Sequence, residues 1–285
     1  MKIKNVKGFV VGINDFVGTG NDLAGCVNDA NDIARLLRPV STMVGDAIDT
    51  TPFFHCSTQV TMLLDSQATL KAATAVLKTF VASLEPEELG FIWFSQHGTF
   101  VKDLNRDEPD GTDEALVFQD LGLMIDDEVG KILAKRKSGS YIFLGTDSCH
   151  SGTVQRLYQP VDRKPERKVR YLPPERLPLS VRPTISQMRA LGAVKANQAP
   201  LQGVIHFAGC QDTEYCYDAQ FKSRPNGAFT YYLLRRALQA LKPGATFGDW
   251  FTAVRGFLPS VEYPQSPKCN AYSSMLALPL PLRKG

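Results

Sequence analysis

Two residues that could cooperate in catalysis each follow an apolar run of the same kind. Cys149 comes after the apolar run 141–144 and a short polar cluster, and His97 comes after the run 91–94. Wholly apolar runs of this length are typical of buried strands in a parallel sheet. The carboxyl ends of parallel strands meet at one edge of the sheet, where open α/β sheets bind ligands. We therefore expect a thiol and an imidazole at one cleft.

This pair has the chemistry of a nucleophile and its base. A nearby imidazole lowers the pKa of a thiol and carries its proton, so His97 could activate Cys149 and then protonate a leaving amine. The backbone N–H groups of Gly98 and Cys149 are the natural donors to an oxyanion, because glycine lets a carbonyl approach closely. His150 is not the expected base, since adjacent residues of an extended chain point in opposite directions.

The rest of the chain alternates strand and helix patterns. The expected helices show apolar residues at helical spacing, and each expected strand is a short apolar run. Strands are expected at 8–13, 60–64, 91–96, 115–118, 141–146 and 203–209, with an edge strand within 272–280; helices are expected at 27–37, 70–81, 126–137, 227–241 and 246–258. This alternation predicts an α/β fold with a mostly parallel sheet covered on both faces.

Composition excludes several classes of protein. The net charge of +3 and the absence of a basic stripe with interleaved aromatics argue against a nucleic-acid partner. No apolar run approaches the ~20 residues that span a bilayer, and residues 1–7 lack the apolar core of a signal peptide. Six irregularly spaced cysteines do not form a disulfide scaffold. We expect a cytoplasmic protein without membrane contact and, because the first expected strand lies so near residue 1, without a prodomain.

The composition changes between residues 158 and 200. Prolines alternate there with arginines and lysines, and few residues could be buried. We interpret this stretch as an exposed basic linker.

Several motifs, in register, resemble those of the metacaspases, caspase-like cysteine peptidases of clan CD. The matching segments are 25–30 (GCVNDA), 95–98 (SQHG), 110–116 (DGTDEAL), 125–128 (IDDE), 147–152 (DSCHSG), 209–212 (GCQD) and 263–267 (YPQSP). The dyad spacing also fits caspases, in which the His lies about 50 residues before the Cys. The resemblance implies a single caspase-like domain over 1–285, with a large-subunit-like region at 1–157, the linker at 158–200 and a small-subunit-like region at 201–285.

The resemblance also implies an activity, which is endopeptidase cleavage of proteins or peptides after Arg or Lys. Acids at the positions of Asp29 and Asp147 line the specificity pocket in this family, and Cys26 and Ser95 border it. A buried carboxylate pair favours a guanidinium or an ammonium group. The implied enzyme is a monomer and needs no cofactor for its chemistry.

The chain departs from the family pattern at two places. Gln96 stands before the catalytic His where the family usually has Gly, which would narrow or polarise the cleft. Many metacaspases need calcium, and the acids implied as ligands here are Asp113, Asp126 and Asp127. The fourth expected acid is replaced by Arg156, so we expect weak calcium dependence or none.

The sequence also suggests self-cleavage, and it leaves two alternatives to a peptidase, which are a protein-binding scaffold and a zinc site. Self-cleavage in the basic linker is expected after Arg167, Lys168 or Arg170. The alternative function is a catalytically silent caspase-like scaffold that binds proteins, although the intact dyad and both pocket acids argue against it. Zinc binding by Cys149 and His150 with Cys210 and Cys216 lacks the usual ligand-pair spacing. Cys56, Cys216 and Cys269 are expected to be thiols without a special role.

Overall fold

The computed structural model describes most of the chain. The described residues are 2–37, 59–102, 112–149, 167–173, 176–177, 199–211, 214–222 and 224–282. Arg156 and parts of the linker lie outside them.

A six-stranded sheet forms the centre of the molecule. Its order is β12-β9-β7-β3-β1-β2. The strands are β1 (Asn5–Gly12), β2 (Val60–Leu64), β3 (Glu88–Ser95), β7 (Tyr141–Asp147), β9 (Val204–Ala208) and β12 (Lys268–Ala271). All neighbours are parallel except the edge strand β12, which runs antiparallel to β9. The inner strands β3 and β7 are buried almost throughout, which explains their unbroken apolar sequences.

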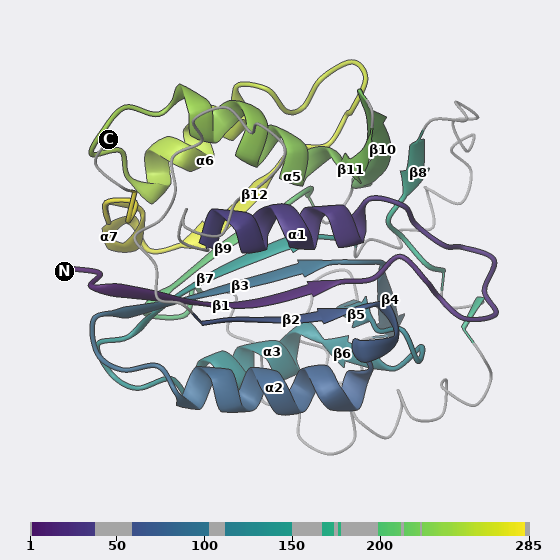
Figure 1. Cartoon of the computed structure of the whole chain (residues 1–285), viewed down its shortest axis with the longest axis horizontal. Coiled ribbons are helices and arrows are strands. Elements are labelled where there is room, and N and C mark those ends of the chain that lie inside the picture. Colours follow the sequence, from purple (N-terminus) through teal and green to yellow (C-terminus); the bar gives the residue numbers. More distant parts are fainter. Residues whose placement is uncertain are drawn as a thin grey trace.

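Helices cover both faces of this sheet (Figure 1). One face carries α1 (Cys26–Leu37), α5 (Ala228–Tyr232), α6 (Phe247–Arg255) and α7 (Ser273–Leu276), and the other carries α2 (Leu70–Ala82) and α3 (Asp126–Leu133). The chain continues from α5 through a π-helical turn (Leu233–Ala237) and a 3-10 turn (Leu238–Ala240). A further 3-10 turn spans Asp65–Gln67. Each face has its own hydrophobic core, with Trp93 and Phe143 in one and Phe94 and Ile92 in the other.

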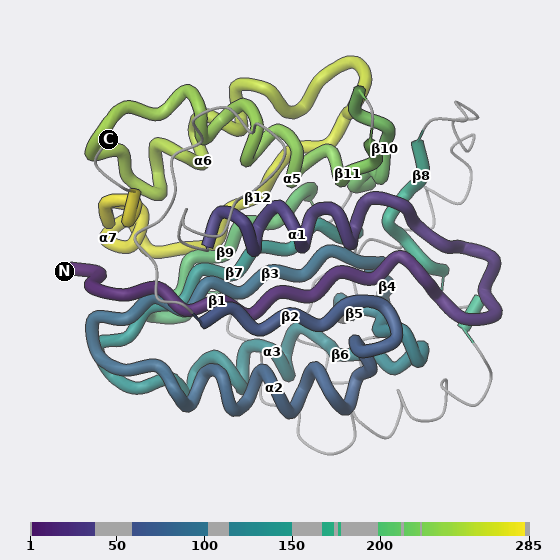
Figure 2. Tube along the Cα trace, viewed as in Figure 1, coloured from purple at the N-terminus to yellow at the C-terminus, as the bar shows by residue number. Residues whose placement is uncertain are grey.

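Two small sheets lie at the carboxyl end of the central strands. One contains β4 (Gly98–Lys102), β5 (Thr112–Val117) and β6 (Leu123–Ile125), and the other contains β8 (Arg167–Val169), β10 (Tyr217–Phe221) and β11 (Arg224–Gly227). Figure 2 shows the loop between β1 and α1 at the same end of the molecule as these sheets. The loop between β1 and α1, the sheet of β4, β5 and β6, and the sheet of β8, β10 and β11 therefore all lie where the parallel strands end.

The fold class and most central elements are as expected from the sequence. The expected strands at 8–13, 60–64, 91–96, 141–146 and 203–209 are all present, and α3 is shorter than expected. The tail differs, because 273–276 is helical and the edge strand comes before it, at β12. The linker also differs, because Arg170 and Leu172 within 158–200 are fully buried rather than exposed.

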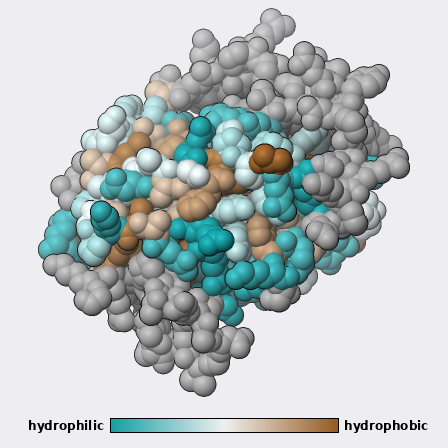
Figure 3. Space-filling model, turned by 90° about the horizontal axis from the view of Figure 1, so that it is seen from above, coloured by the Kyte–Doolittle hydropathy of each residue, from teal (hydrophilic) through white to brown (hydrophobic). Residues whose placement is uncertain are grey.

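The surface shows few large apolar side chains. Figure 3 shows a face on which hydrophobic residues are interspersed with hydrophilic ones. Among the described residues, the exposed large hydrophobic side chains are Val17, Leu201, Phe257, Val261 and Tyr272. In this part of the chain no helix has the length and apolarity needed to cross a bilayer.

Gly145 in β7 tests the packing of the central sheet. A Cβ at this position would overlap the indole ring of Trp93 on the neighbouring strand. Gly145→Ala should therefore lower the free energy of unfolding by about 1–3 kcal/mol, as overpacking of a core does. Urea denaturation measures this change.

Gly130→Ala is the matched control. No heavy atom lies within 4 Å of the Cβ it would add, and the position is helical. The control should be neutral or stabilised by about 0.5–1 kcal/mol. Equal stability of the two variants would contradict the packing of Trp93 against β7.

Candidate active site

Cys149 and His97 follow adjacent parallel strands. β3 and β7 pair in register up to Ser95 and Asp147, and each residue of interest comes two positions after its strand. Both side chains are buried, with His97 only 2% exposed and Cys149 fully covered. The sequence-based expectation that both lie at one edge of the sheet is thus met by the geometry.

The imidazole of His97 is held in a defined orientation. Its Nε2 lies 2.7 Å from the backbone oxygen of Asn21, which makes Nε2 the protonated nitrogen, and its ring packs against Phe16. Nδ1 has no hydrogen-bond partner among the described residues. Burial lowers the pKa of His97, while the backbone carbonyls of Asn21 and Arg170 and the nearby Cys149 act in the opposite direction. The ring is therefore neutral near pH 7, and its Nδ1 can accept a proton.

The expected oxyanion donors already bind a carbonyl. The backbone N–H groups of Gly98 and Cys149 both donate to the backbone oxygen of Arg170, at 3.0 and 3.1 Å. Two N–H groups that converge on one oxygen at this distance form the geometry of an oxyanion hole. The oxygen they hold belongs to the segment that the sequence indicated as an exposed linker.

The side chain of the same residue lies in a pocket of three acids. The Arg170 guanidinium donates through NH2 to Asp29 at 2.7 Å and to Asp218 at 2.8 Å. Its NH1 donates to the Ser95 hydroxyl at 2.7 Å and lies 3.3 Å from a carboxylate oxygen of Asp147. Burial by itself would lower the pKa of Arg170, but the surrounding acids raise it well above its usual value. Asp29, Asp147 and Ser95, which the family resemblance implied as pocket residues, thus lie together around one guanidinium.

Asp218 is the pocket residue that the sequence analysis did not identify. It lies on β10 and also accepts from the backbone N–H groups of Ala24 and Gly25. The 209–212 motif pointed to this region but drew attention to Asp212, which lies outside the described residues. The signal available in the sequence was the run 217–221, in which the acid Asp218 alternates with apolar residues as it would in a strand.

Every pocket acid is fixed by further donors. Asp29 accepts from the backbone N–H of Gly227 and from the side chain of Asn226, and Asp147 accepts from the backbone N–H and hydroxyl of Thr230. Gly227 allows this approach, because a Cβ there would overlap the Asp147 carboxylate and crowd the Arg170 guanidinium. The pocket acids are therefore held in place by donors other than the guanidinium as well.

The chain on both sides of Arg170 runs through the cleft in an extended form. β8 pairs antiparallel with β10, so Val169 faces Tyr217 and Arg167 faces Ala219. The Arg170 N–H then donates to the carbonyl of Cys216 at 3.0 Å. Beyond Arg170, the N–H of Leu172 donates to the carbonyl of Gly98 at 2.9 Å. A segment of this chain is thus added to the edges of two small sheets, as an extended peptide is in β-augmentation.

Cys26 and Gln96 have clear positions. Cys26 begins α1 and is fully buried beside the pocket; burial raises the pKa of its thiol well above the usual value, although Arg170 acts in the opposite direction. The expectation that Gln96 narrows or polarises the cleft is not met. Its side chain is buried and donates to the carbonyl of Val117 at 2.8 Å, which ties the end of β3 to β5.

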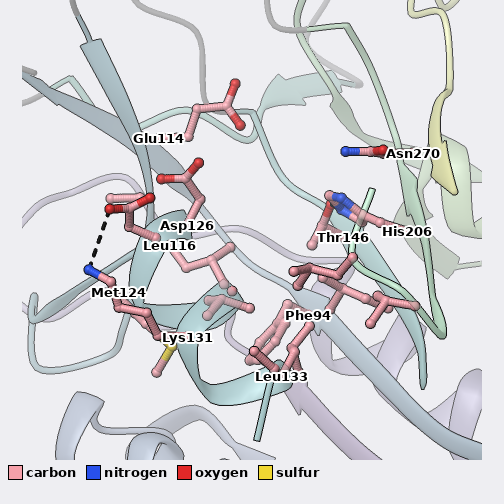
Figure 4. A pocket seen from close by; sticks show the side chains of 18 of the residues that line it. Phe94, Glu114, Leu116, Met124, Asp126, Lys131, Leu133, Thr146, His206 and Asn270 are labelled. Carbon is pink, nitrogen blue, oxygen red and sulfur yellow. Dashed lines mark hydrogen bonds and ion pairs between the residues drawn. The ribbon is translucent and has the colours of Figure 1, made fainter. Parts of the chain in front are cut away.

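The acids implied as calcium ligands come from β5 and α3, not from the strands that precede the dyad. Asp126 and Asp127 open α3, and Asp127 pairs with Lys131 at 3.5 Å. Asp113 lies on β5, but its side chain is outside the described part of the structure, as is Arg156. Together with Glu114, both α3 acids border a cavity of about 380 Å³ whose floor is apolar and includes Phe94 and Leu133 (Figure 4). Glu114, Asp126 and Asp127 carry the oxygen ligands that a hard cation prefers, but among the described residues they do not form a group close enough to hold one.

Comparison with known proteins decides the family. A family model described as the metacaspase, peptidase C14 domain matches residues 6–158. The chain belongs to the metacaspase family. Metacaspase-1 from Saccharomyces cerevisiae is 32% identical over 158 residues, which cover 52% of this chain and 34% of the yeast protein. Metacaspase-1 from Cryptococcus neoformans is 25% identical over 302 residues, which cover 94% of this chain and 63% of that protein. The chain thus spans about a third of the yeast relative.

Solved structures agree on the fold. Protein GSU0716 from Geobacter sulfurreducens has a TM-score of 0.71 at 26% identity, covering 95% of this chain and 96% of its own. Caspase-1 from Spodoptera frugiperda has a TM-score of 0.57 at 11% identity, covering 98% of this chain and 90% of its own. The second likeness establishes the caspase-like fold alone.

The titration of Asp29 reports on the ion pair in the pocket. Burial raises the pKa of Asp29 to about 6, and the guanidinium of Arg170 opposes this rise by stabilising the ionised carboxylate. Below this pKa Asp29 becomes neutral, and its attraction to Arg170 is lost. Removal of the cation in Arg170→Ala should therefore raise the pKa of Asp29 above about 6. A pH titration of ¹³C-carboxyl-labelled aspartate by NMR measures both values.

Asp249 provides the control in the same spectra. It is exposed, and its pKa is lowered by hydrogen bonds from Thr246, so it should titrate identically with and without Arg170. Titration of Asp29 near 4 in both proteins would contradict the buried ion pair.

Proposed function

We propose that this metacaspase is a cysteine endopeptidase that cleaves after arginine, and that its own Arg170–Tyr171 bond is a substrate. The observation that carries the proposal is the simultaneous binding of Arg170 at two points. Its carbonyl accepts from the N–H groups of Gly98 and Cys149, and its guanidinium lies among Asp29, Asp147 and Asp218. A peptide substrate would need both contacts.

The proposed reaction uses the two residues at the ends of β3 and β7. The Cys149 thiol loses its proton to Nδ1 of His97, and the sulfur attacks the carbonyl carbon of Arg170. The negative charge that develops on the carbonyl oxygen is held by the two N–H groups. His97 protonates the departing amine of Tyr171, and water that His97 deprotonates hydrolyses the acyl-enzyme.

The residues after Arg170 support the proposed cleavage, because they hold in place the part of the chain that follows the scissile bond. The ring of Tyr171 is parallel to that of Phe100, with ring centroids 6.1 Å apart, and Leu172 is fully buried. While Arg170 occupies the acidic pocket, no other basic side chain can enter. We therefore propose that the uncut chain is latent toward other substrates.

Arg167 and Lys168 were also expected as cleavage positions, and their contacts favour other roles. The Arg167 guanidinium lies over the ring of Tyr217, and the Lys168 ammonium donates to the backbone oxygen of Asp22 at 2.8 Å. Neither side chain contacts the three acids. We propose that both residues help to seat the strand that presents Arg170.

Calcium dependence, oligomeric state and location are also proposals. We propose weak or no dependence on calcium, on the ground that Arg156 stands where the family has an acid. Peptidase rates measured in chelator and in added calcium should be equal within error, and strict dependence would contradict this. We further propose a cytoplasmic monomer. The small number of exposed large apolar side chains among the described residues supports the monomer.

Self-cleavage is tested by incubating purified full-length chain. We expect two fragments, 1–170 and 171–285, the second of which begins Tyr-Leu-Pro-Pro by N-terminal sequencing. The reaction is intramolecular, so its rate constant should not depend on protein concentration.

Three variants assign the cut. Cys149→Ala and Arg170→Ala should stay intact, because the first lacks the nucleophile and the second lacks the cation that fills the pocket. Arg167→Ala is the matched control, a nearby arginine outside the acidic pocket, and it should still be cut at the same bond. An intact wild-type chain would favour the catalytically silent scaffold, and cleavage in Arg170→Ala would reject the assigned bond.

Selectivity for arginine over lysine follows from the pocket. Both terminal nitrogens of Arg170 have two partners among Asp29, Asp147, Asp218 and Ser95, whereas a lysine offers one shorter point charge. With matched fluorogenic peptides, we expect kcat/KM to be about tenfold or more higher for Arg, which corresponds to about 1.4 kcal/mol. The assay should use enzyme already cut after Arg170, because Arg170 can then leave the pocket and a peptide substrate can enter. Equal rates for Arg and Lys would contradict direct recognition of the guanidinium.

A further inference from the structure

Cys149 and two cysteines from a later loop, Cys210 and Cys216, bring their sulfur atoms together. Cys149 follows β7, whereas Cys210 and Cys216 flank the loop between β9 and β10. Their sulfur atoms all lie within 4.8 Å of one another, and Cys210 and Cys216 are 2.6 Å apart. All three are buried, and Val169, Tyr171 and Tyr215 pack against them. Cys216 is therefore not the unremarkable thiol that the sequence indicated.

We propose that Cys149, Cys210 and Cys216 form a binding site for a thiophilic divalent cation, Zn²⁺. Zinc–sulfur bonds of about 2.3 Å put the sulfur atoms of a tetrahedral site roughly 3.8 Å apart. The sulfur atoms of Cys210 and Cys216 are closer than that, and all three lie within 4.8 Å of one another, so side-chain rotations must separate this pair to admit the cation. The fourth position is left for water.

The surroundings of the sulfurs favour a bound cation. The backbone N–H of Cys216 donates to the sulfur of Cys149, and such bonds hold a metal-bound thiolate in place. When Zn²⁺ binds, the three thiols release their protons to solvent, and no oxidant or reductant is needed.

Metal binding would regulate the peptidase, a consequence that rests on the proposed function. The sulfur of Cys149 cannot attack a carbonyl while its electron pair is shared with the metal. Val169 and Tyr171 pack against the cluster, so we expect zinc to reach it as these side chains move aside, in the uncut chain as well as after cleavage. Zinc would then hold the cut enzyme inactive until a chelator removes it.

The site itself is tested without any activity measurement. Reduced, metal-free, full-length protein is titrated anaerobically with Co²⁺, which reports thiolate ligands by a charge-transfer band in the near ultraviolet. We expect the band to reach a plateau at about one equivalent and to disappear when Zn²⁺ is added. Cys210→Ser and Cys216→Ser should weaken cobalt binding by about 100-fold or more, the upper end of the loss seen when even a supporting residue is removed.

Cys269→Ser is the matched control, because Cys269 lies on β12 and is not part of the cluster. Its cobalt spectrum should equal that of the wild type. An absent band, or a band unchanged in Cys210→Ser, would overturn the site. So would a Cys210–Cys216 disulfide, seen by mass spectrometry as the loss of two hydrogens, in protein that binds no metal.

The regulatory consequence has its own measurement on the cut enzyme. Zn²⁺ should inhibit hydrolysis of an arginine peptide, and Cys210→Ser should need about 100-fold more Zn²⁺ for the same inhibition. Equal inhibition of both proteins would mean that zinc acts on Cys149 without Cys210, which rejects the three-thiol site. If the wild type hydrolyses nothing, the proposed function fails while the cobalt titration still decides whether the site exists.

Discussion

A buried guanidinium among three carboxylates is the interaction on which the carboxyl end of this fold depends. Asp29, Asp147 and Asp218 have almost no contact with solvent, and Arg170 is the cation placed among them. Removing one member of a buried ion pair typically costs about 3–5 kcal/mol, because the other charge is left without compensation. The acids therefore need a cation, either from the chain itself or from a bound peptide. The position of segment 167–172 is therefore linked to the pocket, because the segment supplies the cation unless a bound peptide does.

The pocket is rigid because its acids come from different parts of the fold and each is held by other donors. Asp29 lies in the first turn of α1, Asp147 ends β7, and Asp218 lies on β10. Backbone N–H groups of Gly25, Gly227 and Thr230 bind these carboxylates directly. Such donors stabilise ionised acids and leave few orientations open to them. The site is thus preorganised for a planar, bidentate cation.

The sequence predicted the parts of this arrangement that depend on local pattern. Apolar runs identified the inner strands, and parallel pairing then required that Cys149 and His97 meet at one edge. Asp29 and Asp147 were implied by the resemblance to metacaspases, through the motifs at 25–30 and 147–152.

What the sequence did not predict depends on long-range packing. Arg170 lies in a stretch whose composition indicates exposure, and only the acids of distant elements explain its burial. Asp218 and the thiol cluster were missed for the same reason, since their positions depend on where β10 and the loop before it lie in the fold. Gln96 was assigned to the cleft from its place beside His97, but its hydrogen bond to Val117 turns it toward β5.

The same contacts explain how one segment could serve first as an inhibitor and then as a substrate. In the uncut chain, Arg170 is held in the cleft from both sides, by the pairing of β8 with β10 and by the buried Leu172. Tethering of this kind gives the guanidinium a high effective concentration at the pocket. Cleavage after Arg170 would leave Tyr171 and Leu172 in place but detach Arg170 from them. The arginine would then be held by three strand residues and its ion pairs alone, and a substrate arginine could compete for the three acids.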